Sequence, residues 1–257
     1  MADPAVRLSF DRAATSYDSA ARLQRLTCEL LLDRLADPSP PTVLDAGCGT
    51  VYGKALLAAR WPQARILAAD FAPGMLRQAG GGVCADIQAL PFGPASFDLY
   101  WSSLTIQWCD PACAMAEAFR TLAPDGRLAV SSLAPGTLGE LAEAFGSDGN
   151  RHVLEFSPAT ALTEACASAG FAEISTTQTR VRLHHPDLPS LLRELKALGA
   201  NQVGGRRRSG LLGREAWGQI QARYERLRVA AGLPATFEVI LCRSEERRVG
   251  KECRSRW

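Results

Sequence analysis

Two glycines flanked by acidic residues form the pattern in this sequence that most clearly indicates chemistry. Residues 43–50 read Val-Leu-Asp-Ala-Gly-Cys-Gly-Thr, and Asp70 ends the next apolar segment, residues 66–69. Without a Cβ at Gly47 and Gly49, the backbone can come close to a bound nucleoside. A carboxylate at the end of the following strand can accept hydrogen bonds from both ribose hydroxyls. The pattern therefore predicts an adenosine-containing cofactor at the carboxyl edge of a parallel sheet.

The spacing of the glycines favours S-adenosylmethionine over a dinucleotide. A dinucleotide site has the pattern Gly-x-Gly-x-x-Gly, whereas the third glycine here, Gly53, comes one position late. Asp45, just before the first glycine, would also repel a pyrophosphate but suits the ammonium and sulfonium groups of S-adenosylmethionine. We expect four residues to bind this cofactor: Asp45, Gly47, Gly49 and Asp70. Two alternatives to this site exist. One is a nicotinamide dehydrogenase, a remote alternative, and the other is an ordinary βαβ crossover in which the glycines serve packing and bind no ligand.

Asp-x-Gly-x-Gly at one strand end, followed by an acid at the next, resembles the first two motifs of the class I methyltransferases. Three later segments agree with that order: residues 83–87 read as a short strand ending near Asp86, residues 96–103 as a fourth strand, and residues 123–128 as the turn before a fifth. The resemblance implies that Asp86 reaches the adenine amino group, although alone it would read as a solvated turn acid. It also implies three further cofactor contacts: Met75, Ile87 and Ser102.

Length and composition indicate one globular domain. The chain has 257 residues, of which 47% are apolar and 22% charged. It contains no apolar run of about 18 residues and no basic N-terminus leading into one, so we expect a cytoplasmic protein without a membrane segment. Six of the 29 basic and three of the 27 acidic residues lie within residues 243–257, which leaves 23 basic and 24 acidic residues elsewhere. This near-neutral balance gives no electrostatic support for nucleic-acid binding.

The eight cysteines contain no Cys-x-x-Cys pair, and the Cys109–Cys113 spacing has no histidine or second pair beside it. We therefore expect buried, reduced thiols and no metal site. The thiols expected in apolar or glycine-turn surroundings are Cys28, Cys48, Cys84, Cys166 and Cys242.

Alternating strand and helix patterns predict an α/β fold: the Rossmann-like class I methyltransferase fold, with a seven-stranded, mostly parallel sheet and helices on both faces. We expect an N-terminal helix over residues 11–36, ended by a proline-rich segment. The other expected helices cover residues 52–61, 73–79, 111–122 and 158–169. A sixth strand is expected from Phe171 and a seventh over residues 236–242.

Residues 184–232 form an insertion before the last strand, with expected helices over residues 188–198 and 214–229. Because an insertion there lies above the ligand edge of the sheet, it is expected to be a lid over the acceptor. The domain is expected to end at residue 243, because residues 244–257 lack apolar periodicity and resemble a translated cloning scar.

Three stretches resemble a narrower family, the malonyl-[acyl-carrier protein] O-methyltransferases of biotin biosynthesis (BioC type). They are residues 10–25, with Phe-Asp-Arg-Ala-Ala and Tyr17; residues 101–109, with Gln-Trp at 107–108; and residues 195–214 in the insertion. The resemblance runs from about residue 8 to 243. It implies methylation of a malonyl thioester carried on acyl carrier protein, or on coenzyme A.

The implied reaction is displacement of the sulfonium methyl by a carboxylate oxygen. That oxygen is ionised at neutral pH, so no general base is required, and alignment of the reactants can supply roughly 7–11 kcal/mol. The resemblance gives three substrate-pocket candidates: Tyr17, Trp108 and Lys196. Each also has a simpler interpretation, the aromatics as packing residues and the lysine as a solvated helix charge. No role is expected for three histidines, which should lie in surface loops: His152, His184 and His185.

A basic segment of the insertion is the candidate contact for the acidic carrier protein, unless it is only a solvated loop. Its residues are Arg206, Arg207, Arg208 and Arg214.

One residue departs from the family pattern. Val51 stands where the family usually has glycine, so either the turn has ordinary negative φ there or cofactor affinity is reduced. Two alternatives to the main hypothesis follow from the sequence. One is a methyltransferase of another small carboxylic acid, similar to trans-aconitate. The other is a non-catalytic, S-adenosylmethionine-binding assembly factor, which Val51 makes conceivable.

Overall fold

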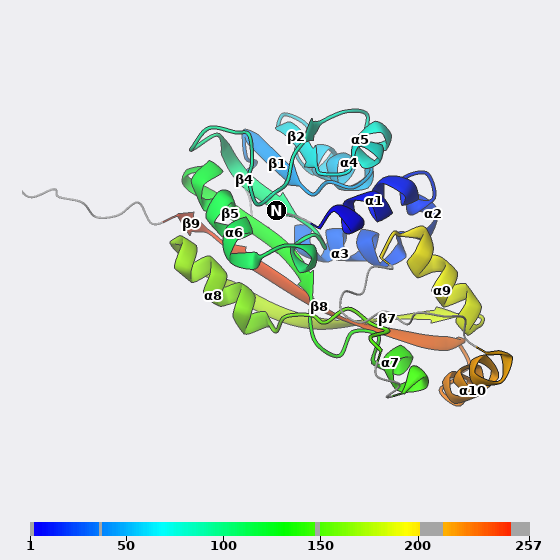
Figure 1. The fold of residues 1–257 in the computed structure, drawn as a ribbon. Helices are drawn as coiled ribbons and strands as arrows, with labels where there is room; N and C mark the ends of the chain where they lie inside the picture. Colours follow the sequence, from blue (N-terminus) through cyan, green and yellow to red (C-terminus); the bar gives the residue numbers. More distant parts are fainter. Residues whose placement is uncertain (1–2, 36–37, 147–149, 201–212, 248–257) are drawn as a thin grey trace, which may run out of the picture.

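The computed structural model describes residues 3–35, 38–146, 150–200 and 213–247 (Figure 1). Its centre is a seven-stranded sheet with the order β3-β2-β1-β4-β5-β8-β7. The strands are β1 (Thr42–Ala46), β2 (Arg65–Asp70), β3 (Val83–Cys84), β4 (Phe97–Ser102), β5 (Leu122–Leu133), β7 (Ser175–His185) and β8 (Leu233–Ser244). Only β8 is antiparallel to its neighbours. The expected mostly parallel sheet of seven strands is confirmed.

Helices cover both faces of this sheet, which explains why the central strands are continuous apolar runs. Val43 of β1 packs in one core cluster with α3 (Arg22–Leu32) and α4 (Tyr52–Arg60), whereas Leu44 packs in a second cluster with α6 (Pro111–Thr121) and α8 (Ala159–Ala169). Consecutive residues of β1 therefore face different helical layers. The four predicted helices after β1 are confirmed to within one residue at each end, including the short α5 (Pro73–Gln78).

The N-terminal segment differs from the expectation of one helix over residues 11–36, which is wrong. It forms three helices: α1 (Pro4–Ala13), α2 (Tyr17–Ala20) and α3. Asp3 starts α1 by accepting a hydrogen bond from the Ala5 N–H. The chain then turns at Ser16, whose hydroxyl donates to the Ala13 and Ala197 carbonyls, and breaks again at Ala21, where ψ is 41°. These breaks let the segment bend over the carboxyl edge of the sheet.

The insertion contains the two expected helices, α9 (Leu188–Ala197) and α10 (Arg214–Glu225). Helix α9 lies beside α2, and α10 lies beside α7 (Gly139–Phe145), a helix that the sequence pattern did not predict (Figure 1).

The sheet continues past the expected domain end at residue 243. Strand β8 includes Ser244, whose hydroxyl donates to the Ala172 carbonyl. Beyond it, β9 (Glu246–Arg247) pairs with β6 (Phe171–Ala172). Residues 244–247 are therefore part of the described fold, whereas the rest of the expected tail lies outside the described residues. Its non-native origin stays a prediction.

The seven described cysteines are free thiols. The expectation of burial is confirmed for Cys28, Cys166 and Cys242, but it is wrong for Cys84, which is exposed, and Cys48 is only half-buried. No helix within the described ranges is long and apolar enough to cross a bilayer.

Candidate active site

The glycine turn after β1 folds back onto the end of β2. Gly47 and Gly49 have φ of 72° and 56°, which side-chain-bearing residues rarely adopt. The Gly47 and Cys48 N–H groups both donate to the Ala69 carbonyl, at 2.8 and 3.0 Å. A Cβ on Gly47 would lie 2.3 Å from Thr105 Oγ1, so contact as well as conformation requires glycine there. This turn forms one wall of a cavity at the carboxyl edge of the sheet.

Asp70 ties this turn to the loop after β2. One carboxylate oxygen accepts from the Gly49 N–H at 2.9 Å and the other from the Ala72 N–H at 2.8 Å. Burial raises the pKa of Asp70 to about 6, although these backbone hydrogen bonds oppose the shift. Each oxygen keeps a further lone pair. The buried carboxylate can therefore receive ribose hydroxyls while it holds both loops.

Asp45 lies in a different place from the one expected. It is buried, and its Oδ2 has no hydrogen-bond partner in the described chain. A Cβ on Gly53 would lie 3.1 Å from that oxygen, which places Asp45 below the first turn of α4 and outside the cavity lining. Burial, and secondly the charge of Asp70, raise the pKa of Asp45 to about 7. Its effect on a ligand would be electrostatic rather than a direct contact.

The first cavity, which we call the cofactor cavity, has an empty volume of about 550 Å³. Eight residues predicted from the sequence line it: Tyr17, Gly47, Gly49, Asp70, Met75, Asp86, Ile87 and Trp108. Seven others were missed: Phe10, Phe71, Ala85, Ser103, Leu104, Thr105 and Cys109. Ser102 is fully buried behind the lining. Side chains alternate between the two faces along a strand, so the residue after Ser102, Ser103, could have been predicted to face the cavity. No local pattern indicated that Phe10 or Phe71 would line it.

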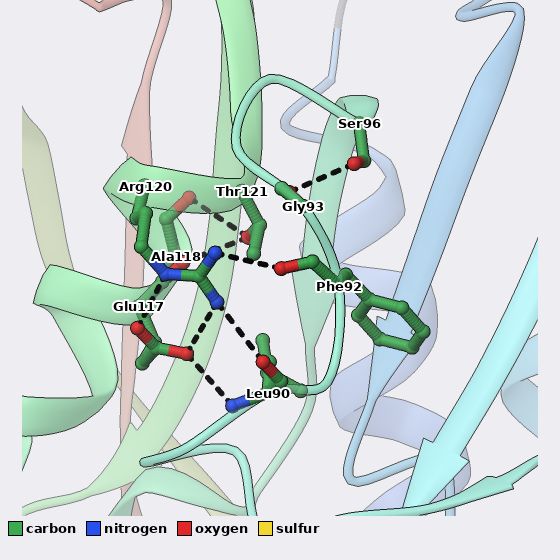
Figure 2. Close-up of polar contacts among 8 residues, drawn as sticks. All are labelled: Leu90, Phe92, Gly93, Ser96, Glu117, Ala118, Arg120 and Thr121. Carbon is green, nitrogen blue, oxygen red and sulfur yellow. Dashed lines mark hydrogen bonds and ion pairs between the residues drawn. The ribbon is translucent and has the colours of Figure 1, made fainter.

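A clamp on α6 holds the segment that follows Asp86 and Ile87. Figure 2 shows the guanidinium of Arg120 bonded to Glu117 and to the carbonyls of Leu90 and Phe92, at 2.6–3.0 Å. Glu117 also accepts from the Leu90 N–H at 2.7 Å. The hydrogen bond from Arg120 lowers the pKa of Glu117. Since both charges are satisfied, the clamp fixes a loop that has no regular secondary structure.

The N-terminal helices cover the cofactor cavity, and two side chains attach them there. Asp11 of α1 accepts from the Gly74 N–H on α5 at 2.5 Å, and Asp18 of α2 accepts from the Thr50 hydroxyl at 2.5 Å. Tyr17 lies above the glycine turn, since a Cβ on Gly49 would be 3.9 Å from its ring. Burial raises the pKa of Tyr17 above its ordinary range, so the phenol stays protonated.

A second cavity, which we call the acceptor cavity, adjoins the first. Four residues line both: Phe10, Tyr17, Leu104 and Trp108. The rings of Phe10 and Trp108 meet edge to face, with centroids 5.3 Å apart. The acceptor cavity has an empty volume of about 820 Å³. Its other walls come from α3, Gln107, the end of β5, residues 137–138 just before α7, residues 152–156, α9 with Leu198 and Ala200 after it, and β8.

The remaining substrate and carrier candidates are placed as follows. Tyr17 and Trp108 line both cavities. A residue that contacts the acceptor next to the cofactor would have to lie there. Lys196 is exposed on α9 and lines neither cavity, so the structure does not support its role as a carboxylate ligand. Arg214 is exposed at the start of α10. Three candidates lie outside the described residues: Arg206, Arg207 and Arg208.

The expectation that all three histidines lie in surface loops is wrong. His152 lines the acceptor cavity and stacks on Phe145, with ring centroids 4.1 Å apart. His185 is buried at the end of β7, where burial lowers its pKa, and its Nδ1 lies 3.6 Å from Glu194 of α9.

The structure also resolves the question that Val51 raised. Its φ is −75° and ψ −17°, and its side chain is half exposed at the start of α4. Valine is unstrained in this conformation, so the expectation of reduced cofactor affinity loses its basis. The assembly-factor alternative rested on the same residue and loses its support from the sequence.

Comparison with known proteins gives two kinds of similarity. A family model described as a methyltransferase domain matches residues 44–130. The malonyl-[acyl-carrier protein] O-methyltransferase of Dechloromonas aromatica (strain RCB) is 44% identical over 239 residues, 91% of each chain. The protein of that name from Laribacter hongkongensis (strain HLHK9) is 43% identical, over 91% of this chain and 86% of the relative.

Among solved structures, geranyl diphosphate C-methyltransferase from Streptomyces coelicolor A3(2) has a TM-score of 0.53 at 15% identity, over 87% of this chain and 80% of that one. At that identity the similarity concerns the fold alone.

Proposed function

Because the chain belongs to the malonyl-[acyl-carrier protein] O-methyltransferase family, we propose that it transfers the methyl group of S-adenosylmethionine to the free carboxylate of a malonyl thioester on acyl carrier protein. It has the class I methyltransferase fold. The product would be the methyl ester that starts the pimeloyl part of biotin synthesis. The observation that carries this proposal is the similarity along nine-tenths of the chain to relatives that share one name.

The residues of the cofactor cavity fit S-adenosylmethionine. Asp70 keeps lone pairs that can accept from the ribose hydroxyls, and we assign Asp86 and Ile87, which line the same cavity, to the adenine. Asp45 carries a buried oxygen without a hydrogen-bond partner in the described chain, so its charge can favour a cationic ligand. When bound, the cofactor supplies a methyl group activated by a sulfonium.

The chain's own contribution is to bind, align and desolvate. The acceptor oxygen forms the bond to the methyl carbon, and the electron pair of the broken carbon–sulfur bond stays on sulfur, so no proton moves. Tyr17 and Trp108 lie in the wall between the cavities, where they can exclude water from the line of attack. Without proton transfer, the rate depends on how well the two cavities align the reactants.

The test is incubation of the protein with methyl-labelled S-adenosylmethionine and malonyl acyl carrier protein. We expect a labelled, base-labile methyl ester on the carrier. Malonyl-coenzyme A, free malonate and trans-aconitate serve as parallel acceptors. Preference for trans-aconitate would contradict the proposal and favour the other small-acid methyltransferases.

Carrier recognition is a separate part of the proposal. Arg214 is exposed at the start of α10, and the neighbouring basic residues lie in the same insertion. Replacing Arg206, Arg207, Arg208 and Arg214 with Glu should raise the KM for malonyl carrier protein and leave that for a small malonyl thioester unchanged. The effect on the carrier should shrink in high salt. Equal losses on both substrates would instead indicate a disturbed insertion.

A further inference from the structure

We propose that Gln24 binds the carboxylate of the acceptor in the acceptor cavity. This inference rests on the proposed function and adds to it the residue that recognises the reacting group. Gln24 lies on α3 and lines the acceptor cavity but not the cofactor cavity. An amide at this place can hold the acceptor without competing for the cofactor.

The Gln24 amide has unused hydrogen-bonding capacity. Its Oε1 is buried and has no hydrogen-bond partner in the described chain. A carboxylate cannot satisfy this oxygen, because both groups only accept hydrogen bonds, so it would bind the N–H groups of the amide instead. Since Oε1 is the enclosed end, the two N–H groups on Nε2 are the donors left to face the cavity. Two N–H donors on one nitrogen suit a ligand whose oxygens are acceptors.

Gln107, the other amide of the cavity, and Thr137 already have protein partners. Gln107 donates to the Leu104 carbonyl at 2.7 Å, and its Oε1 accepts from the Ser132 hydroxyl at 3.4 Å. Thr137 accepts from the Glu238 N–H at 3.0 Å. These contacts hold the side chains in place for the fold, which leaves Gln24 as the amide available for a ligand.

Glu194 of α9 restricts where an anion can lie. Its carboxylate is 3.9 Å from Arg22, and burial raises its pKa. A negative group in the wall repels the acceptor carboxylate from α9. The part of the cavity beside Glu194 is therefore unfavourable for the acceptor carboxylate, which leaves the neutral amide of Gln24 as a place for it.

A neutral donor also suits the chemistry. Negative charge on the attacking oxygen is consumed in the transition state, so a Lys or Arg ion pair would stabilise the reactant more than the transition state. An amide N–H orients the carboxylate with less of this penalty. Of the described residues that line the cavity, none is Lys or Arg.

The experiment compares Gln24→Leu and Gln24→Glu with Leu26→Gln, a control on the exposed face of the same helix. We expect Gln24→Leu to lower kcat/KM for malonyl carrier protein by about 10- to 150-fold, the effect of one hydrogen bond to a charged group. Gln24→Glu should lower it further by repulsion. The Kd for S-adenosylmethionine, measured by calorimetry, should stay within about twofold of wild type.

Melting temperature separates recognition from a structural role. Gln24→Leu removes a buried unpaired amide, so its Tm should equal or exceed that of the wild type. A wild-type kcat/KM in Gln24→Leu would overturn the inference, as would a loss of activity that follows a loss of Tm or of cofactor binding. A wild-type protein that binds the cofactor but methylates no malonyl thioester would instead overturn the proposed function and remove the premise.

Discussion

The cofactor cavity and the acceptor cavity share four residues but are built in different ways. The cofactor cavity takes its polar groups from turns at the ends of β1, β2, β3 and β4, neighbours in one sheet. The acceptor cavity is assembled from α3, β5, the turn before α7, α9 and β8, which are far apart in the sequence. Sheet topology alone brings the first set together, whereas the second depends on packing of separate helices. We therefore expect substitutions in the strand-end turns to change cofactor binding alone, and substitutions that disturb the shared residues to change the binding of both ligands.

Asp70→Ala should act on the cofactor most strongly. It removes hydrogen bonds to the ribose, so affinity for S-adenosylmethionine should fall by about 1.5–3 kcal/mol, measured by calorimetry. The exposed acid Asp33 gives a matched control, because Asp33→Ala makes the same charge change away from both cavities. Unchanged affinity in Asp70→Ala would contradict the assignment of Asp70 to the ribose.

Gly47→Ala should destabilise the protein by about 1–3 kcal/mol, because the new Cβ meets Thr105 in a backbone region disfavoured for alanine. Gly218→Ala is the control: it lies inside α10 with no atom near its Cβ position, and should stabilise by up to about 1 kcal/mol. Urea unfolding measures both. Equal effects would mean that the glycine turn is not constrained by Thr105.

Cofactor binding and protein stability should respond to pH in opposite directions. The native pKa values of Asp70 (about 6) and Asp45 (about 7) exceed their common unfolded value of 3.8, so the native state holds more protons between these limits. Their contribution to stability therefore falls as pH rises from about 4 to 7. A cationic cofactor prefers both ionised, so its Kd should decrease by about tenfold from pH 5 to 7.5.

Calorimetry across this range checks the pH prediction, with thermal melts of the free protein alongside. Asp70→Asn should flatten the dependence of Kd on pH. A cofactor Kd that stays constant with pH in the wild type would show that neither carboxylate titrates on binding.

Asp11→Ala tests the shared wall, because Asp11 attaches α1, which carries Phe10, to α5. Loss of this hydrogen bond should weaken cofactor binding and raise the KM for the acceptor, each by a factor of about 2 to 12. Binding calorimetry and steady-state kinetics on the same preparation give both numbers. An effect on only one ligand would show that the two cavities bind their ligands independently, although they share four lining residues.

Val51→Gly should have the smallest effect. Since Val51 already has negative φ, its replacement should leave the Kd for S-adenosylmethionine within about twofold. A tenfold tightening would show that the bound state needs a different turn conformation.

The same contrast explains what could be predicted from the sequence. Gly47, Gly49 and Asp70 were identified because adjacent parallel strands must bring their ends together. Phe10 could not be placed, because its position depends on breaks at Ser16 and Ala21 that apolar periodicity does not record.

The exposed position of Lys196 on α9 could have been predicted from the helical period. Leu191, Leu195 and Leu198 face inward at the spacing i, i+4, i+7, so the residue after Leu195 points about 100° away. Gln24 lies on a mostly apolar helix face that also carries the buried Thr27, so its residue type does not distinguish a binding residue from a tolerated polar one.

The interior position of β8 has a consequence for synthesis of the protein. Among the described residues this is the last long strand, yet it lies between β5 and β7. A nascent chain whose β8 is still inside the ribosome exposes two unpaired strand edges, which are templates for aggregation. Late, non-local pairing of this kind also slows folding. Overproduction should therefore benefit from chaperones that bind the incomplete sheet.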